Sequence, residues 1–84
     1  MQKAILYRVT GKIETFISRN GETFSDREIF AFLGANFVAL PEKENVFYID
    51  PAISIPAQFP YNKLAVKQFG INPILGDVLE LAAI

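Results

Sequence analysis

A capping box in the first half of the chain fixes the start of one short helix. Ser25 is followed three residues later by Glu28, so the serine oxygen can accept from the Glu28 amide while the glutamate reaches back to the Ser25 amide. Phe24 and Ile29 flank this box in the positions of a hydrophobic staple. Gly34 suits the left-handed residue that ends a helix. Because the helix is only about two turns long, packing on another element must hold it.

Strand-like segments and a second helix surround this first helix. The segments predicted as strands are rich in β-branched and aromatic residues: 3–9, 12–18, 35–40, 46–50 and 77–83. The second helix is predicted at residues 63–69, with Asn62 as its N-cap and Gly70 at its end. The order ββαββαβ predicts one α+β domain over residues 1–84. In this fold, both short helices cover one face of a two-layer antiparallel or mixed sheet.

The first two segments are expected to form a hairpin with two different faces. Thr10 and Gly11 read as a two-residue turn, which would place Tyr7 opposite Glu14. One face would be largely aliphatic and form the floor under the helices: Ala4, Leu6, Arg8, Ile13, Thr15 and Ile17. The other face would be an apolar cluster rimmed by charge: Ile5, Tyr7, Val9 and Phe16 with Lys3, Lys12 and Glu14. The second face has the composition of an interaction surface.

Residues 51–59 offer a competing explanation for that second face. Prolines at positions 51, 56 and 60 forbid a central strand, so residues 52–59 are expected to be extended coil or an edge segment. Folded over the hairpin, Ile53, Ile55 and Phe59 would bury the face within the monomer. The sequence leaves both explanations open.

The composition removes the commonest catalytic mechanisms. The chain has no histidine and no cysteine, and therefore neither the usual general base nor a thiolate nucleophile. It also has no glycine-rich phosphate loop and no acidic cluster at calcium-loop spacing. We therefore expect a protein that is not an enzyme, with no catalytic residue, metal or cofactor. The catalytic alternative is a small carboxylate-dependent hydrolase, for which Asp50, Asp77 and Glu80 would have to converge.

Charge and hydropathy bound the partners and the location. A net charge of −1 gives no general attraction to nucleic acid. The nucleic-acid alternative would stack bases on Tyr7 and Phe16, with Lys3 and Lys12 on the backbone. The apolar segment after Met1 reaches Arg8 too soon for a signal-peptide core, and the uncharged stretches at 29–41 and 51–62 are too short and too broken for a membrane-spanning helix. We therefore expect a soluble cytoplasmic protein that does not bind membranes.

Two motifs in the second half resemble a known family. Residues 60–65 read Pro-x-Asn-x-x-Ala, and residues 74–77 read Ile-x-Gly-Asp before an apolar segment. Both motifs resemble a family of small proteins of bacteria, phages and mobile elements whose domain has no known function. The resemblance implies an origin in such an element and no particular activity. It leaves open whether Asn62, Ala65, Gly76 and Asp77 act in function or only in capping and turn geometry.

The expected function is therefore non-catalytic. We expect a protein–protein interaction module or self-associating accessory protein, most simply a homodimer. The candidate surface is the charged-rim face of the first hairpin: Ile5, Tyr7, Val9, Phe16, Lys3 and Lys12.

Overall fold

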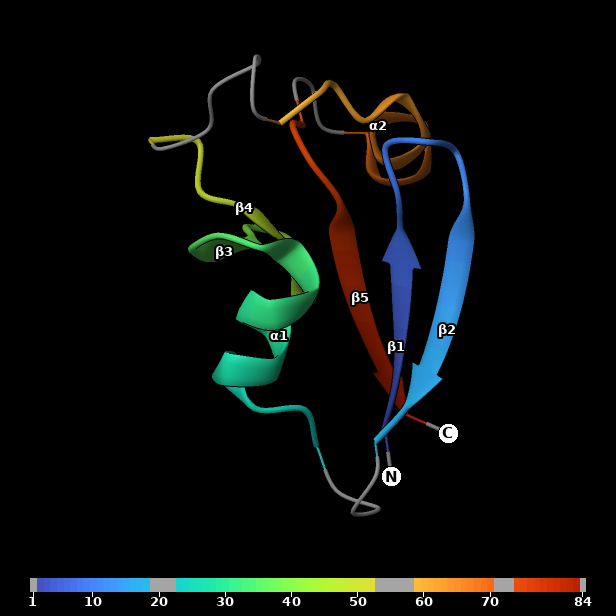
Figure 1. Ribbon diagram of the computed structural model, residues 1–84, viewed down its shortest axis with the longest axis vertical. Coiled ribbons are helices and arrows are strands. Elements are labelled where there is room, and N and C mark those ends of the chain that lie inside the picture. Colours follow the sequence, from blue (N-terminus) through green and yellow to red (C-terminus); the bar gives the residue numbers. More distant parts are fainter. Residues whose placement is uncertain (1, 19–22, 53–58, 71–73, 84) are drawn as a thin grey trace.

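A computed structural model describes residues 2–18, 23–52, 59–70 and 74–83. Within these ranges the protein forms a five-stranded antiparallel sheet with two short helices (Figure 1). The elements are β1 (Gln2–Tyr7), β2 (Ile13–Ile17), α1 (Asp26–Leu33), β3 (Phe37–Leu40), β4 (Lys43–Ile49), α2 (Lys63–Phe69) and β5 (Val78–Ala83). The α+β class and the order ββαββαβ are confirmed.

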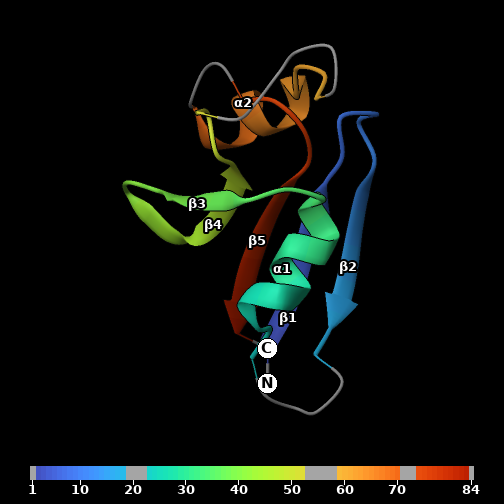
Figure 2. The ribbon, with the colours of Figure 1, turned by 60° about the vertical axis from the view of Figure 1, so that its left-hand side comes forward.

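The first and last strands of the chain pair in the middle of the sheet. The strand order is β2-β1-β5-β4-β3, and β1 pairs with β5 from Gln2↔Ala83 to Tyr7↔Val78. The joint between β5 and β4 is much shorter, with only Val46↔Glu80 and Phe47↔Leu79 in register. The sheet therefore consists of a three-stranded part, β2-β1-β5, and the β3–β4 hairpin, which projects to one side of it (Figure 2).

The first helix begins and ends as its sequence predicts. The Ser25 side chain accepts from the Glu28 amide at 3.2 Å, and the Glu28 carboxylate accepts from the Ser25 amide at 3.0 Å. Gly34 takes the left-handed conformation at the end of the helix. The staple residues Phe24 and Ile29 are both buried in the same core cluster. Local capping thus fixes α1, and its apolar side holds it against the sheet.

The two helices cover opposite faces of the sheet, so the prediction that they share one face is wrong. The cluster under α1 includes Leu6 of β1 and Leu79 of β5. The cluster under α2 includes their immediate neighbours, Tyr7 and Val78. Neighbouring residues of a strand point to opposite faces, so the two clusters lie on opposite sides. The central strands β1 and β5 are apolar on both faces, and for this reason their pattern does not indicate which face each helix covers.

The predicted boundary between the third and fourth strands also differs from the structure. The connection between the segments predicted at 35–40 and 46–50 is shorter than expected, because β4 already begins at Lys43 and pairs there with Leu40 of β3. The register shifts between Ala39 and Leu40, which admits this tight connection. Of the predicted extended segment at residues 52–59, positions 53–58 lie outside the described residues.

Gly76 provides a test of the packing where α2, β4 and β5 meet. Its φ is +79°, and a Cβ atom at this position would clash with the Ile49 side chain. Gly11 also has a positive φ, +89°, but faces open space. We expect Gly76→Ala to lower the free energy of unfolding by about 3 kcal/mol, from left-handed strain plus overpacking. Gly11→Ala should cost only the strain, about 1–2 kcal/mol. Urea denaturation measures both, and equal losses would contradict the packing argument.

Candidate interaction surface

The turn between β1 and β2 is one residue longer than the sequence suggested. The Gly11 amide donates to the Arg8 carbonyl at 2.9 Å, and the Arg8 amide donates to the Lys12 carbonyl at 2.9 Å. This is a tight turn followed by a left-handed glycine, the usual three-residue hairpin loop. Tyr7 consequently pairs with Ile13, and the predicted pairing of Tyr7 with Glu14 is wrong.

The shift of register by one residue exchanges the two faces of β2. Thr15 pairs with Ile5 and Ile17 with Lys3, so these residues lie on the face that was expected to carry Phe16. Phe16 pairs with Ala4 and packs on the α1 side, where its ring lies 5.0 Å from that of Phe32. The predicted cluster of Ile5, Tyr7, Val9 and Phe16 therefore does not exist as one surface, and Ile13, Thr15 and Ile17 are not a floor under the helices.

Tyr7 lies under α2 rather than on the surface. It is only 5% exposed, and its ring meets that of Phe69 edge to face at 5.1 Å between centroids. Its hydroxyl donates to a Glu80 carboxylate oxygen at 2.8 Å. Burial, and then the Glu80 carboxylate, raise the pKa of Tyr7 to about 12. Tyr7 is therefore a neutral core residue at physiological pH and is not available to a partner.

The residues at the hairpin turn form an ion-paired group. Arg8 contacts Glu14 at 2.9 Å and Asp77 at 3.2 Å, and Lys12 lies 3.6 Å from Glu14. Hydrogen bonding by Arg8 lowers the pKa of the Glu14 carboxyl, and Glu14 in turn raises the pKa of Arg8. The other Asp77 oxygen accepts from the Val9 amide at 3.0 Å. Val9 and Lys12 thus belong to a structural turn, and Asp77 holds that turn against the start of β5.

The three carboxylates of the hydrolase alternative each have a separate structural task. Asp77 binds the hairpin turn, Glu80 accepts from Tyr7, and Asp50 accepts from the Ala52 amide at 2.9 Å in its own turn. Within the described ranges, no three Asp or Glu side chains converge as a metal site. A structural contact therefore accounts for each of the three carboxylates.

Asn62 joins three elements at a buried point. It is 0% exposed, and its side-chain oxygen accepts from the Ala65 amide at 2.9 Å, which confirms its role as N-cap of α2. Its side-chain nitrogen donates to the Tyr7 and Gly76 carbonyls, both at 2.9 Å. Three of the four motif positions, Asn62, Ala65 and Gly76, therefore meet at one junction between α2, the end of β1 and the approach to β5.

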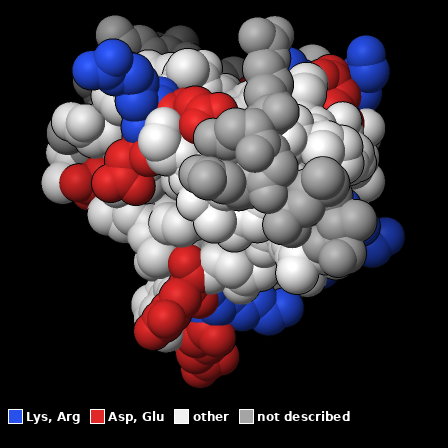
Figure 3. Space-filling view, turned by 90° about the horizontal axis from the view of Figure 1, so that it is seen from below, with Lys and Arg blue, Asp and Glu red and all other residues white. Residues whose placement is uncertain are grey.

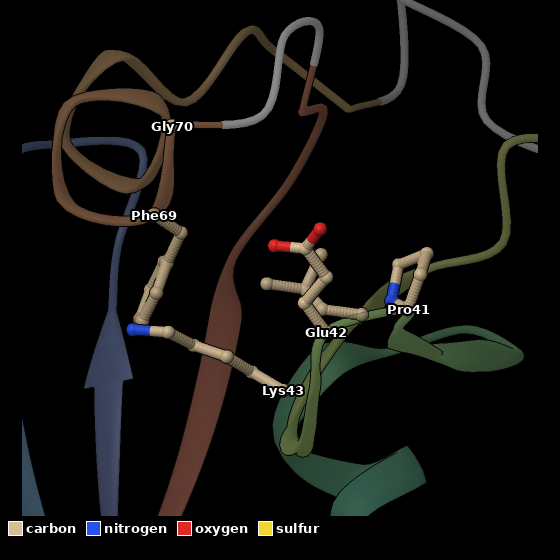
Figure 4. Close-up of a pocket in the computed structure, with 6 residues that line it drawn as sticks. Pro41, Glu42, Lys43, Phe69 and Gly70 are labelled. Atoms are coloured by element: carbon tan, nitrogen blue, oxygen red, sulfur yellow. The ribbon is translucent and has the colours of Figure 1, made fainter.

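The pockets lined by described residues contain few groups that could bind or transform a ligand. One of ≈ 330 Å³ lies between the β3–β4 turn and the end of α2 (Figure 4), lined by Leu40, Pro41, Glu42, Lys43, Phe69 and Gly70. The Lys43 ammonium is already placed 5.5 Å from the centre of the Phe69 ring. A wider, open groove of ≈ 660 Å³ runs beside α1. Neither gathers a set of buried polar groups.

The remaining candidate for an interaction surface lies on β2 and on the neighbouring strands β1 and β5, on the face of the sheet that carries α2. We call it the open face: Ile5, Ile13, Thr15 and Ile17, with Lys3, Glu80 and Ala82 beside them. These residues are cross-strand partners in the β2-β1-β5 part of the sheet. Ile13 and Ile17 are 53% and 52% exposed, the highest values among the large apolar residues of the described chain. Sequence reasoning missed Ile13, Thr15 and Ile17, although a left-handed Gly11 closing a three-residue loop was the signal that could have found them.

Charge around the molecule is mixed rather than one-sided. Figure 3, seen from the end at which β1 begins, shows acidic and basic side chains interspersed with no large area of one sign. On the open face itself the charged residues are one lysine, Lys3, and one glutamate, Glu80. Its core is therefore apolar, and its charges are balanced.

No protein-family model, curated protein or solved structure matches this chain. The resemblance carried by residues 60–65 and 74–77 therefore stays a sequence-based prediction. Among the described residues, no helix is long and apolar enough to cross a membrane.

Asn62→Asp tests the buried junction. The aspartate would keep the oxygen that caps α2 but would lose both donors, and would place a negative charge against two carbonyl oxygens. We expect a loss of about 3–5 kcal/mol in the free energy of unfolding, because buried acceptors are left unpaired. Ser25→Ala, which removes an exposed cap, should cost only about 1 kcal/mol. Chemical denaturation compares the two, and similar losses would contradict the central role of Asn62.

The raised pKa of Tyr7 predicts a loss of stability at alkaline pH. The group is neutral in both states below the ordinary tyrosine pKa of 10.0, and the unfolded chain ionises first as the pH rises toward about 12. The stability of the native protein relative to Tyr7→Phe should therefore fall between about pH 9 and about pH 12. Urea titrations of both proteins across this range measure it. A constant difference between them would contradict a buried, neutral Tyr7.

Proposed function

We propose that this protein is a non-catalytic binding module that joins another polypeptide strand through β2 and the open face. The observation that carries the proposal is an edge strand whose two isoleucines, Ile13 and Ile17, are about half exposed. In line with the sequence motifs, the proposal includes a cytoplasmic protein of a bacterium, phage or mobile element.

The backbone of β2 supports strand addition. The Ser18 amide donates to Gln2, and the Arg8 amide donates to Lys12, so the even-numbered residues of β2 are the ones hydrogen-bonded to β1. In an antiparallel pair such residues alternate with residues whose N–H and C=O point away from the partner strand. The outward-pointing groups are therefore those of Ile13, Thr15 and Ile17, along the outer edge of the sheet.

The side chains of β2 offer one of the usual protections of an edge strand, an inward-pointing charge, and that charge is already paired. Natural sheet edges carry lysine, proline, a bulge or an inward-pointing charge that blocks further pairing. The charged residue within β2 is Glu14, which pairs with Leu6 and so lies on the face opposite Ile13 and Ile17. Its carboxylate is already held by Arg8. Strand pairing would bury the two isoleucines and satisfy the outward backbone groups together.

The two aromatic residues that the nucleic-acid alternative requires, Tyr7 and Phe16, do not form a surface for stacking bases. Tyr7 is buried under α2, and Phe16 packs against Phe32 on the other face. Neither ring lies beside the other to form a stacking platform. The observations favour a polypeptide partner.

A variant of the edge strand tests this function. Ile13→Lys with Ile17→Lys puts charge on the open face, whereas Phe30→Lys with Ala31→Lys adds the same charge to exposed residues of α1. We expect the immobilised native protein to retain a polypeptide, either its own labelled copy or a protein of a bacterial extract. The β2 variant should retain it at least about tenfold less well, and the α1 variant normally. Equal retention by all three folded proteins would contradict the proposal.

A further inference from the structure

We infer that the strand that adds to β2 is β2 of a second copy of this chain, antiparallel to it and related by a two-fold axis at Thr15. This inference rests on the proposed function and names its partner. In the paired arrangement, Ile13 lies opposite the partner subunit's Ile17, and Thr15 lies opposite the partner subunit's Thr15.

The positions of the outward backbone groups support this register. Ile13, Thr15 and Ile17 each direct one N–H and one C=O away from β1. A two-fold axis at Thr15 pairs all of these groups with the same groups of the second copy. With the axis at Glu14, Ile17 has no partner residue within β2 of the second copy. With the axis at Phe16, Ile13 has none. The register centred on Thr15 is therefore the one that uses the whole exposed edge.

Charge supports the same register. With the axis at Thr15, Glu14 lies opposite the partner subunit's Phe16, and no like charges meet within β2. With the axis at Glu14, two carboxylates would lie directly opposite each other, which is unfavourable. The sequence of β2, Ile-Glu-Thr-Phe-Ile, is thus self-complementary when it runs antiparallel to itself.

The side chains would then form one surface across both copies. Residues paired across antiparallel strands share a face, so the isoleucines of both chains lie on the same side as Ile5. Thr15 would pair with its own copy, a favourable cross-strand combination. The two three-stranded parts become one continuous sheet, and both α1 helices lie on its opposite face. To match the open face equally well, a strand of another protein would need two apolar residues spaced like Ile13 and Ile17 around a small residue like Thr15.

Cysteine cross-linking tests the register in a chain that has no cysteine of its own. In this arrangement the Cα atoms of Thr15 and the partner subunit's Thr15 are about 5.5 Å apart, within disulfide reach. Thr15→Cys should therefore form a disulfide dimer at least tenfold faster than Thr10→Cys, an exposed cysteine in the turn. Ile13→Cys should cross-link with Ile17→Cys when the two proteins are mixed. It should not cross-link efficiently with itself, since those positions are ~13 Å apart.

The outcomes separate this inference from the proposed function. A native protein that sediments as a dimer, together with Thr15 cross-linking and the mixed Ile13–Ile17 disulfide, supports the inference. A dimer in which Thr15→Cys cross-links no faster than Thr10→Cys overturns the register. A strict monomer at millimolar concentration overturns the second copy as partner. In both of these cases, retention of another polypeptide that is lost in the β2 variant would leave the proposed function standing.

Discussion

The pairing of β1 with β5 is the constraint on which the rest of the molecule depends. The two strands hydrogen-bond along their whole length although they come from opposite ends of the chain. The β3–β4 hairpin joins this pair through only a short ladder, and each helix packs against it from a different side. Asn62 closes one end of the pair, because its amide binds the carbonyl of Tyr7 at the end of β1 and that of Gly76 just before β5.

The surface of the protein follows from one residue in the first turn. With Gly11 in the left-handed conformation, the hairpin loop has three residues and Phe16 joins the core beneath α1. With a two-residue loop, Phe16 would instead lie beside Ile5, and the isoleucines of β2 would be buried. Because side chains alternate along a strand, one residue added to the loop decides which of the two alternating sets of β2 side chains is exposed. The most exposed large apolar residues of the described chain, Ile13 and Ile17, therefore lie on an edge strand, where backbone groups can also bind.

The parts of the fold predicted from sequence are those fixed by neighbouring residues. The capping box at Ser25, the N-cap at Asn62 and the left-handed Gly34 and Gly70 are all found in the structure. Each needs only a side chain and amides a few residues away. The candidate site was predicted less well, since only Ile5 and Lys3 of its six residues lie on the open face. Asp77 and Asn62 also bind groups more than ten residues away, which no local pattern indicates.

The sequence by itself determined the order of the elements, the ends of both helices and the lack of histidine and cysteine chemistry. It could do so because turns, caps and side-chain chemistry are local properties. Only the tertiary structure decided which face each helix covers and which side of β2 faces outward. The strands β1 and β5 are apolar on both faces, and several turn lengths satisfy the same local residues around Gly11. The free energy that separates these arrangements comes from packing between distant segments, such as Tyr7 against Phe69 and Phe16 against Phe32.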